Sequence, residues 1–425
     1  MTACTNTPQR SLRGSNLLLR FYDFGATSRF AALLGATRHF VAPISQFWSS
    51  KYSILFYMEN IMQPYKPQKL PIENMDWKPL ITLVGRANSE LSKYDGLLKG
   101  IPNPHVLLSP LTIQEATLSS SIEGTQATIS EVLEKEAGKS YSEEKQNDIQ
   151  EIINYRTAML AAEEMLKKRP FIHLNMIREL HSILLSGVRG QNKARGQFRL
   201  EQNWIGSPGC SIKEAKYIPP SPMDLMEALD NWEKYVNSDD IDILIQLSFV
   251  HSQFEIIHPF KDGNGRIGRI LIPIFLFARK YLTCPVFYLS EYLENNRSEY
   301  YRRLNDITRK NDWQGWTVFF LNAIIKQAQG NSIKAEKIIS LYKEMKEKIP
   351  LCVHSQYASY IADSLFMRPI FNSVQFMENT KIESRGTANK MLSKLVQEGI
   401  LTISRKPTGR NAAIYSFDDL IDIVA

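Results

Sequence analysis

Long hydrophobic runs and clustered cysteines are both lacking in this sequence. No apolar stretch reaches the roughly 18 residues that a membrane-spanning helix needs, so we expect no membrane partner. The four cysteines stand at positions 4, 210, 284 and 352, too scattered for a metal-binding cluster or a disulfide framework. Such cysteine usage is typical of a reducing compartment, and we expect a cytoplasmic protein.

An excess of charge of one sign is also missing. The net charge of +7 is mild for 425 residues and does not by itself indicate nucleic-acid binding. A hydrophobic content of 44% is ordinary for a globular protein, and the length allows two or three domains. Composition therefore indicates an ordinary globular protein, and the function has to be inferred from motifs.

The most informative stretch is His258–Arg269, with the sequence HPFKDGNGRIGR. Apolar residues at helical spacing flank it on both sides: Ile243, Leu244, Leu247 and Val250 before it, and Ile267, Ile270, Leu271, Ile274 and Phe275 after it. This pattern predicts a buried helix, a tight loop and a second buried helix.

The residue types in this loop suit a polyphosphate. Gly263 and Gly265 permit positive φ and close approach of a ligand to the backbone. Backbone N–H groups ahead of a helix form an anion site. Arg266 and Arg269 share a face of the following helix, although its dipole disfavours each cation there by roughly 0.3–1 kcal/mol. We therefore expect a ligand with several negative charges.

Two further side chains add chemistry to the loop. Asp262 offers the oxygen ligands that Mg²⁺ prefers, and Mg²⁺ commonly bridges substrate phosphates. His258 stands at the mouth of the loop and has the ordinary pKa of a general base near neutral pH. Each feature alone is more often structural, but their combination at fixed offsets predicts polyphosphate binding with proton transfer.

The segment resembles the signature of Fic-domain proteins, His-x-Phe-x-Asp/Glu-Gly-Asn-Gly-Arg-x-x-Arg, and every position is filled. The resemblance implies a mainly α fold, with a helical core covering about residues 120–330. It also implies transfer of AMP from ATP to a Ser, Thr or Tyr hydroxyl of a target protein, and of the protein itself. His258 would accept the hydroxyl proton, and Phe260 would anchor the loop.

The same resemblance assigns the phosphate contacts. Asp262 would hold Mg²⁺ on the phosphates, and Asn264 with the loop amides would steady the α-phosphate. Arg266 and Arg269 would hold the β- and γ-phosphates, which leave together. Catalysis would then rest on positioning and charge stabilisation.

A second motif, Ser119–Gly124, has the sequence SSSIEG and resembles the family's inhibitory motif, Ser/Thr-x-x-x-Glu-Gly/Asn. Taken alone, it reads as the end of a helix with Gly124 as its C-cap. Beside a complete loop motif, we expect Glu123 to pair with Arg269 and to occupy the place of a γ-phosphate. Ser119, Glu123 and Gly124 are thus the predicted inhibitory residues.

Two more segments are expected near the site. Residues 199–220 are predicted to form a hairpin, because Gly and Pro residues occur at its turn. The segment resembles the family's flap, which lies over the active site. An extended target segment could add to the flap as a strand. Tyr300 is expected to contact the nucleotide. The predicted nucleotide-binding set is Asp262, Gly263, Asn264, Gly265, Arg266, Arg269 and Tyr300.

The rest of the chain divides into five expected parts. Residues 1–57 contain one acidic residue, Asp23, and we interpret them as a disordered or spurious extension. Residues 58–140 form a helical region that carries the inhibitory helix, with a helical pattern from Leu80 to Tyr94. Residues 141–330 form the Fic domain, and residues 331–349 form a connecting helix.

Residues 350–425 are expected to form a winged helix-turn-helix. Ser384 is a plausible N-cap of a helix that stops at Gly399. A strand–turn–strand pattern follows it, and the whole is similar to the tails of many Fic proteins. Basic residues would lie on its recognition helix and wing: Arg385, Lys390, Lys394, Arg405, Lys406 and Arg410. They suit DNA phosphates or a protein partner, and both stay open.

Other functions also stay open on the sequence. The protein could be a DNA-binding regulator with a secondary Fic core, although its intact motif argues against a vestigial site. A Fic transferase of another phosphate-linked group, such as phosphocholine, is a further alternative. Gly265 argues against a kinase-like relative in which Lys takes that position. Neither a monomer nor a homodimer is excluded.

Overall fold

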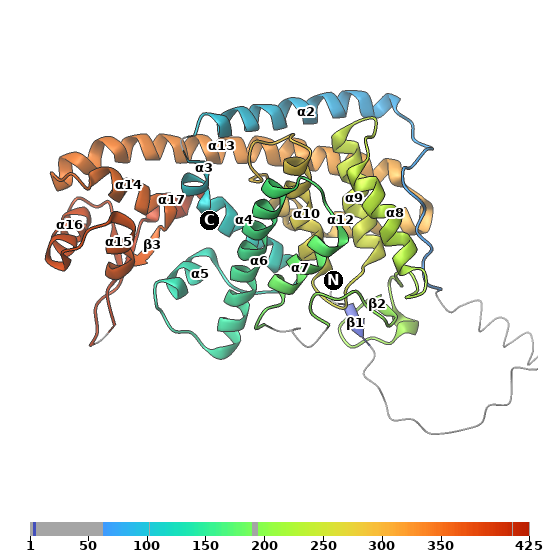
Figure 1. Ribbon diagram of the computed structural model, residues 1–425, viewed down its shortest axis with the longest axis horizontal. Helices are drawn as coiled ribbons and strands as arrows, with labels where there is room; N and C mark the ends of the chain where they lie inside the picture. The colour runs from blue at the N-terminus through green and yellow to red at the C-terminus, as the bar shows by residue number, and fades with distance from the viewer. Residues whose placement is uncertain (1–2, 6–62, 102, 189–193, 410, 425) are drawn as a thin grey trace, which may run out of the picture.

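The computed structural model describes residues 3–5, 63–101, 103–188, 194–409 and 411–424, and these are mainly α-helical (Figure 1). The predicted fold class is confirmed in that respect. The helices are α2 (Lys78–Lys99), α3 (Pro104–Leu107), α4 (Ser109–Ile122), α5 (Ile129–Glu136), α6 (Glu143–Lys168), α7 (Leu174–Leu184), α8 (Leu225–Asn237), α9 (Ile243–Ile257), α10 (Asn264–Ala278), α11 (Ser290–Asn295), α12 (Arg297–Lys310), α13 (Trp313–Val353), α14 (Ala358–Met367), α15 (Ser373–Thr380), α16 (Arg385–Gln397) and α17 (Asp418–Val424).

The central feature is the helix–loop–helix formed by α9 and α10, as predicted. Helix α9 begins at Asp242, whose side chain accepts hydrogen bonds from the backbone N–H groups of Leu244 and Ile245. It is apolar almost all round and therefore lies inside the molecule. It ends at His258, which has a left-handed φ of 50°. Gly263, with a φ of 77°, then precedes α10, so the motif occupies the short turn between two buried helices.

Residues 331–349, which we predicted as a connecting helix, are helical. They form part of α13, which runs unbroken over 41 residues from Trp313 to Val353. Helix α2 packs along it, which gives its apolar side a long partner (Figure 1). Pro350 lies in the last turn, where the loss of one backbone hydrogen bond does not end the helix at once.

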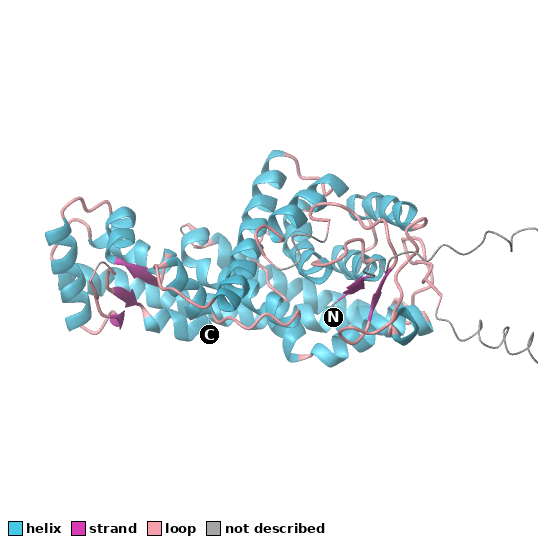
Figure 2. Cartoon of the chain, turned by 90° about the horizontal axis from the view of Figure 1, so that it is seen from below, coloured by secondary structure: helices cyan, strands magenta, loops and turns pink. Residues whose placement is uncertain are grey.

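The C-terminal part combines α14, α15 and α16 with a three-stranded antiparallel sheet. Its strands are β3 (Ile370–Asn372), β4 (Thr402–Arg405) and β5 (Ile414–Ser416), in the order β3-β5-β4 (Figure 2). The predicted helix, turn and strand pair are present, while β3 and α17 were not predicted. The winged-helix assignment itself stays a prediction.

The expected hairpin at 199–220 is reduced in the structure. It contains one short strand, β2 (Asn203–Ile205), and a single bridge between Ile205 and Tyr217. The other edge of β2 pairs antiparallel with β1 (Ala3–Thr5). Apart from β1, the segment 1–57 that we interpreted as an extension lies outside the described residues, so that interpretation stays a prediction.

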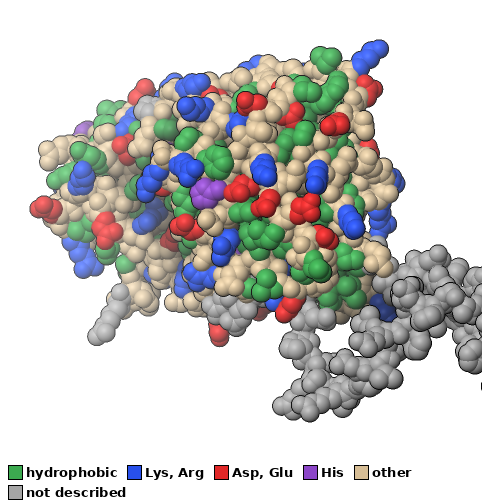
Figure 3. All heavy atoms as spheres, turned by 45° about the vertical axis from the view of Figure 1, so that its right-hand side comes forward, with side chains coloured by type: hydrophobic (Ala, Val, Ile, Leu, Met, Phe, Trp, Pro, Cys, Tyr) green, Lys and Arg blue, Asp and Glu red, His purple; other side chains and the backbone are tan. Residues whose placement is uncertain are grey.

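The surface in view carries positive and negative side chains interspersed, in keeping with the mild net charge (Figure 3). Among the described helices, none combines the length and apolarity that a bilayer crossing requires. The two small sheets lie at opposite ends of the described structure (Figure 2), and the helix–loop–helix motif lies toward the end that holds β2.

Candidate active site

The loop between α9 and α10 is held rigidly by its own side chains. Phe260 is fully buried, and its ring stacks on His181 with centroids 3.7 Å apart. The Asn264 side chain accepts a hydrogen bond from the Phe260 N–H and donates one to the Phe260 carbonyl, at 2.8 and 2.9 Å. Asn264 therefore stabilises the loop backbone in this structure. The sequence predicted only a phosphate contact for this residue.

His181 supports the same loop from α7. Its Nδ1 accepts a hydrogen bond from the Gly196 N–H, so its Nε2 carries the proton and donates to the Asp262 carbonyl at 3.0 Å. Burial lowers the pKa of His181 to about 4, which keeps the ring neutral. This histidine is a support that the sequence did not reveal, because its partners lie 15 and 81 residues away.

His258 lies at the C-terminal end of α9, almost completely buried. Its Nδ1 lies 3.2 Å from the Glu255 carbonyl, an acceptor only, so Nδ1 carries the proton there. Burial, aided by the nearby charge of Arg199, lowers the pKa of His258 to about 4. The ring is therefore neutral at physiological pH, and its Nε2 keeps the free electron pair that a general base needs.

Arg199 fixes the position of the His258 backbone. Its Nε donates to the His258 carbonyl at 3.0 Å, and its NH2 group donates to the Pro220 carbonyl at 2.6 Å. Its own N–H donates to the Pro259 carbonyl at 2.9 Å. This fully buried side chain thus joins the segment expected as a flap to the loop between α9 and α10. Sequence reasoning missed it because Arg199 lies 59 residues from His258.

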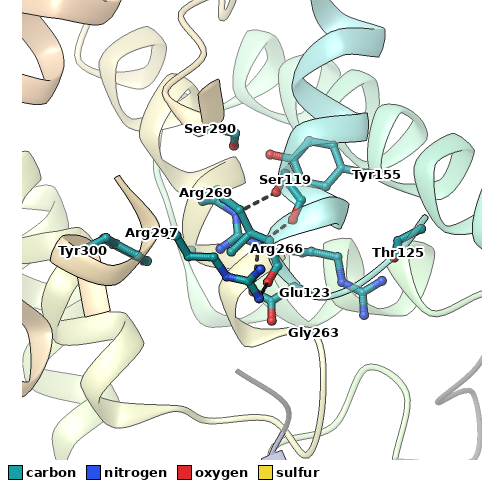
Figure 4. Close-up of polar contacts among 12 residues, drawn as sticks. Ser119, Glu123, Thr125, Tyr155, Gly263, Arg266, Arg269, Ser290, Arg297 and Tyr300 are labelled. Atoms are coloured by element: carbon teal, nitrogen blue, oxygen red, sulfur yellow. Dashed lines mark hydrogen bonds and ion pairs between the residues drawn. The ribbon is translucent and has the colours of Figure 1, made fainter. Parts of the chain in front are cut away.

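The two predicted motifs meet directly, as Figure 4 shows. The Arg269 NH2 group lies 2.9 Å from Oε1 of Glu123 and 2.9 Å from the Ser119 carbonyl, and Nε donates to the Ser119 hydroxyl at 2.7 Å. Gly265 allows this approach, since a Cβ there would lie 2.2 Å from Oε1 of Glu123. Gly124 ends the motif with a φ of 100°.

The electrostatics of this pair favour a charged carboxylate. Burial alone would raise the pKa of Glu123, but nearby positive charges, among them Arg269, outweigh burial and lower it to about 2. Glu123 is therefore ionised at neutral pH and holds the place of an anion beside Arg269.

Arg266 and Asp262 form the other wall of the loop. Arg266 NH2 lies 3.6 Å from Oδ1 of Asp262, and NH1 lies 3.3 Å from Oε2 of Glu151. Among the described residues, the buried Arg266 Nε finds no hydrogen-bond partner, so a donor remains for a bound anion.

The metal expectation rests on Asp262 alone. In the described part of the chain, no three His, Cys, Asp or Glu residues are grouped to hold a metal ion. Asp262 is partly exposed, and one carboxylate combined with substrate phosphates is a usual Mg²⁺ environment. The residues therefore fit a metal ion that arrives with the nucleotide.

A pocket of about 50 Å³ lies against these groups. It is too small for a nucleotide while the Glu123 carboxylate stands in it. Tyr300, which we expect to contact the nucleotide, lines it, and that side chain is nearly fully buried with its hydroxyl 3.0 Å from His251. Lining residues that we did not predict are Ile205, Tyr217, Glu255, Ile256, Tyr301, Leu304, Asn305 and Thr308.

The fold and site define a mainly helical protein in which a glycine-rich loop and two arginines form an anion pocket that an in-chain carboxylate fills. The sequence pattern of the Fic/DOC family N-terminal region matches residues 81–164, and that of the Fic/DOC family matches residues 171–276. The chain thus contains a region similar to the Fic/DOC family N-terminal region and, after it, a region similar to the Fic/DOC family itself.

Known proteins resemble parts of the chain. The chain is 28% identical over 251 residues to the protein adenylyltransferase Fic of Drosophila mojavensis, which covers 56% of this chain and 43% of that protein. It is 31% identical over 176 residues to a protein of Aquifex aeolicus named a probable protein adenylyltransferase, covering 40% of this chain and 49% of that protein. The chain thus matches about half the length of these curated relatives.

The fold has a solved counterpart. A crystal structure of a Fic family protein from Desulfovibrio desulfuricans superimposes with a TM-score of 0.52 at 17% identity, covering 84% of this chain and 98% of that one. At this identity the likeness shows the fold alone.

Proposed function

We propose that the protein transfers AMP from ATP to a hydroxyl of a protein, itself included, and that Glu123 restrains this activity. The observation that carries the proposal is the Glu123–Arg269 ion pair at 2.9 Å inside the pocket that His258 also lines. An ionised carboxylate on this arginine marks the place of a substrate anion. The names of the relatives in Drosophila and Aquifex support the same reaction.

The proposed reaction follows from the roles of the side chains. The neutral His258 accepts the hydroxyl proton at Nε2 while the hydroxyl oxygen forms a bond to the α-phosphorus. The bond between the α-phosphorus and the bridging oxygen breaks. Pyrophosphate leaves, and Arg266 and Arg269 stabilise its negative charge. A Mg²⁺ ion held by Asp262 would neutralise charge on the phosphates.

The segment over the site suits a protein substrate. Strand β2 already accepts an extended segment at one edge, since β1 pairs with it through residues 3–5. Main-chain pairing of this kind can hold a peptide independently of its sequence. A target segment on this edge would be presented close to Tyr217 and His258, which line the pocket.

Labelled ATP tests the proposal. In the Glu123→Gly variant, label from [α-³²P]ATP should reach protein, label from [γ-³²P]ATP should not, and addition of His258→Ala should abolish the transfer. Transfer of the γ-label would instead show a kinase. No transfer of either label to the protein itself or to lysate proteins would overturn the proposal.

A further inference from the structure

An unpaired carboxyl lines the same pocket. Glu255 lies in the last turn of α9, three residues before His258, and lines the pocket together with Arg269 and Tyr300. Within the described part of the chain, its carboxyl makes no hydrogen bond or ion pair, and Oε1 is buried without a partner. A buried acceptor that is left unpaired costs about 1–3 kcal/mol, so a ligand that supplied a donor would bind more tightly.

The backbone of α10 makes room for this carboxyl. A Cβ at Gly268 would lie only 2.1 Å from Oε1 of Glu255. Burial raises the pKa of Glu255 to about 7, as expected for a carboxyl without a cation in contact with it. The fold thus leaves space for the Glu255 carboxyl, but no described residue donates a hydrogen bond to its Oε1.

Several other polar groups of the pocket are already engaged. Arg269 is paired with Glu123, and the Tyr217 hydroxyl donates to the Ile256 carbonyl. The Tyr300 hydroxyl is bonded to His251, and the Thr308 hydroxyl donates to the Asn305 carbonyl. Glu255 therefore stands out as an acceptor that these contacts leave open.

The chemistry of ATP limits what Glu255 can recognise. In its ionised form, Glu255 repels phosphate oxygens, which carry negative charge and offer no donor near neutral pH. The donors of ATP lie on its nucleoside half, in the ribose hydroxyls and the amino group of the base. Glu255 also lies near Tyr300 of α12, and Tyr301 of the same helix lines the pocket with them.

We propose that Glu255 is a specificity-determining residue that accepts a hydrogen bond from the nucleoside half of ATP. This inference rests on the proposed function, because it takes ATP as the ligand of the pocket. The donor is either a ribose hydroxyl or the exocyclic amine, and analogues that lack one of them distinguish the two. Glu255 is not assigned to proton transfer, which is left to His258.

Binding measurements test the assignment without any transfer reaction. Equilibrium dialysis of the Glu123→Gly protein would compare ATP with 2′-deoxy-ATP, 3′-deoxy-ATP and purine riboside triphosphate. One analogue should bind about 5- to 150-fold more weakly than ATP, since it leaves Glu255 unpaired. Adding Glu255→Ala should bring that ratio to within about twofold of unity, and Glu255→Gln should retain most of it, because its amide oxygen still accepts.

Two further variants separate recognition from folding. Gln253→Ala removes another buried polar side chain of α9, one that donates to the Gln68 carbonyl outside this pocket, and it should leave the ratio unchanged. Gly268→Ala would displace the Glu255 carboxyl and should lower the ratio even if Glu255→Ala fails to fold.

The outcomes are distinct. The inference falls if the Glu123→Gly protein binds all three analogues as tightly as ATP, or if both Glu255→Ala and Gly268→Ala keep the full ratio. If the ratio changes as expected but no AMP reaches protein, the inference holds and the proposed transfer fails. If AMP is transferred while the ratio stays unchanged, only the inference fails.

Discussion

At the scale of single residues, the state of the site depends on what Arg269 holds. Its guanidinium is fully buried and makes three contacts with Ser119 and Glu123. A buried guanidinium without an anion carries a large desolvation cost, so loss of Glu123 makes a phosphate the favoured replacement. The same contact therefore explains both the structural order of the site and its proposed restraint.

The first prediction concerns this pair. Glu123→Gly should tighten ATP binding by about 10- to 100-fold, corresponding to ~1.4–2.8 kcal/mol, because the competing carboxylate is gone. Ser119→Ala is the matched control: it removes one acceptor from Arg269 Nε but leaves Glu123, and its effect should be a few-fold at most. Isothermal titration calorimetry measures both, and equal affinity of Glu123→Gly and wild type would refute the restraint.

The second prediction concerns pH. Burial lowers the pKa of His258 from 6.5 to about 4, so the neutral base dominates at all higher pH values. In Glu123→Gly protein, kcat/KM for AMP transfer should therefore show no fall near pH 6.5 attributable to His258, and its acid limb should lie near pH 4. The negative charge of Glu123 raises this pKa, so the loss of that charge works against an acid limb near pH 6.5. An acid limb at pH 6.5 that is lost on replacement of His258 would contradict the structure.

At the scale of elements, the segment around β2 and the end of α9 are joined by a buried cation rather than by a sheet. Arg199 donates to the carbonyls of His258 and Pro220, and burial lowers its pKa to about 10, still well above neutral pH. Backbone carbonyls rather than a carboxylate satisfy this charge. The joint is consequently sensitive to any side chain that cannot make the same set of hydrogen bonds.

The third prediction follows from that joint. Arg199→Met should lower the free energy of unfolding by about 2–4 kcal/mol, since it leaves several buried carbonyls without a donor. Urea denaturation of the full chain measures the loss. Arg178→Met is the control, because that exposed side chain donates only to the Gly196 carbonyl and should cost less than about 1 kcal/mol. Equal losses for the two variants would show that Arg199 does not act as the joint.

At the scale of the whole molecule, the C-terminal part contacts the helices around the inhibitory motif. Helices α14 and α17 pack on α4, which carries Ser119, and β3 packs on α5. In β4, Ser404 donates to Glu134, and Arg405 donates to the Gly138 carbonyl at 3.2 Å. Of the basic residues expected to contact a partner, Lys394 and Arg405 thus bond within the protein, Lys394 to the Cys352 and Val353 carbonyls.

The fourth prediction tests this docking. Arg405→Ala should raise the hydrogen-exchange rates of amides in residues 129–138, because the turn after α5 loses a contact with β4. Lys406→Ala changes the next residue, which is exposed, and should leave those rates as they are. Hydrogen exchange of the full chain, measured by mass spectrometry, tests this prediction. Equal exchange rates of residues 129–138 in both variants would contradict the contact.

Local pattern accounts for a large part of this protein. The apolar spacing on each side of the loop predicted α9 and α10, and the Gly-rich sequence between them predicted a turn that approaches a ligand closely. These features depend on residues within one or two helical turns, where spacing alone reports the buried face. The pairing of Glu123 with Arg269 was inferred from resemblance to a family, since 146 residues separate them.

Tertiary structure decided what local pattern leaves open. Helix α13, which packs against α2, α14, α16 and α17, continues through residues 331–349 and past Pro350 despite the local signal for a stop. Arg199 and His181 acquire their roles only when distant backbone carbonyls arrive beside them. Among the described residues, none places a hydrogen-bond donor on Oε1 of Glu255, and only the packed fold decides this. Sequence spacing records periodicity along one element, whereas contacts between elements depend on packing in three dimensions.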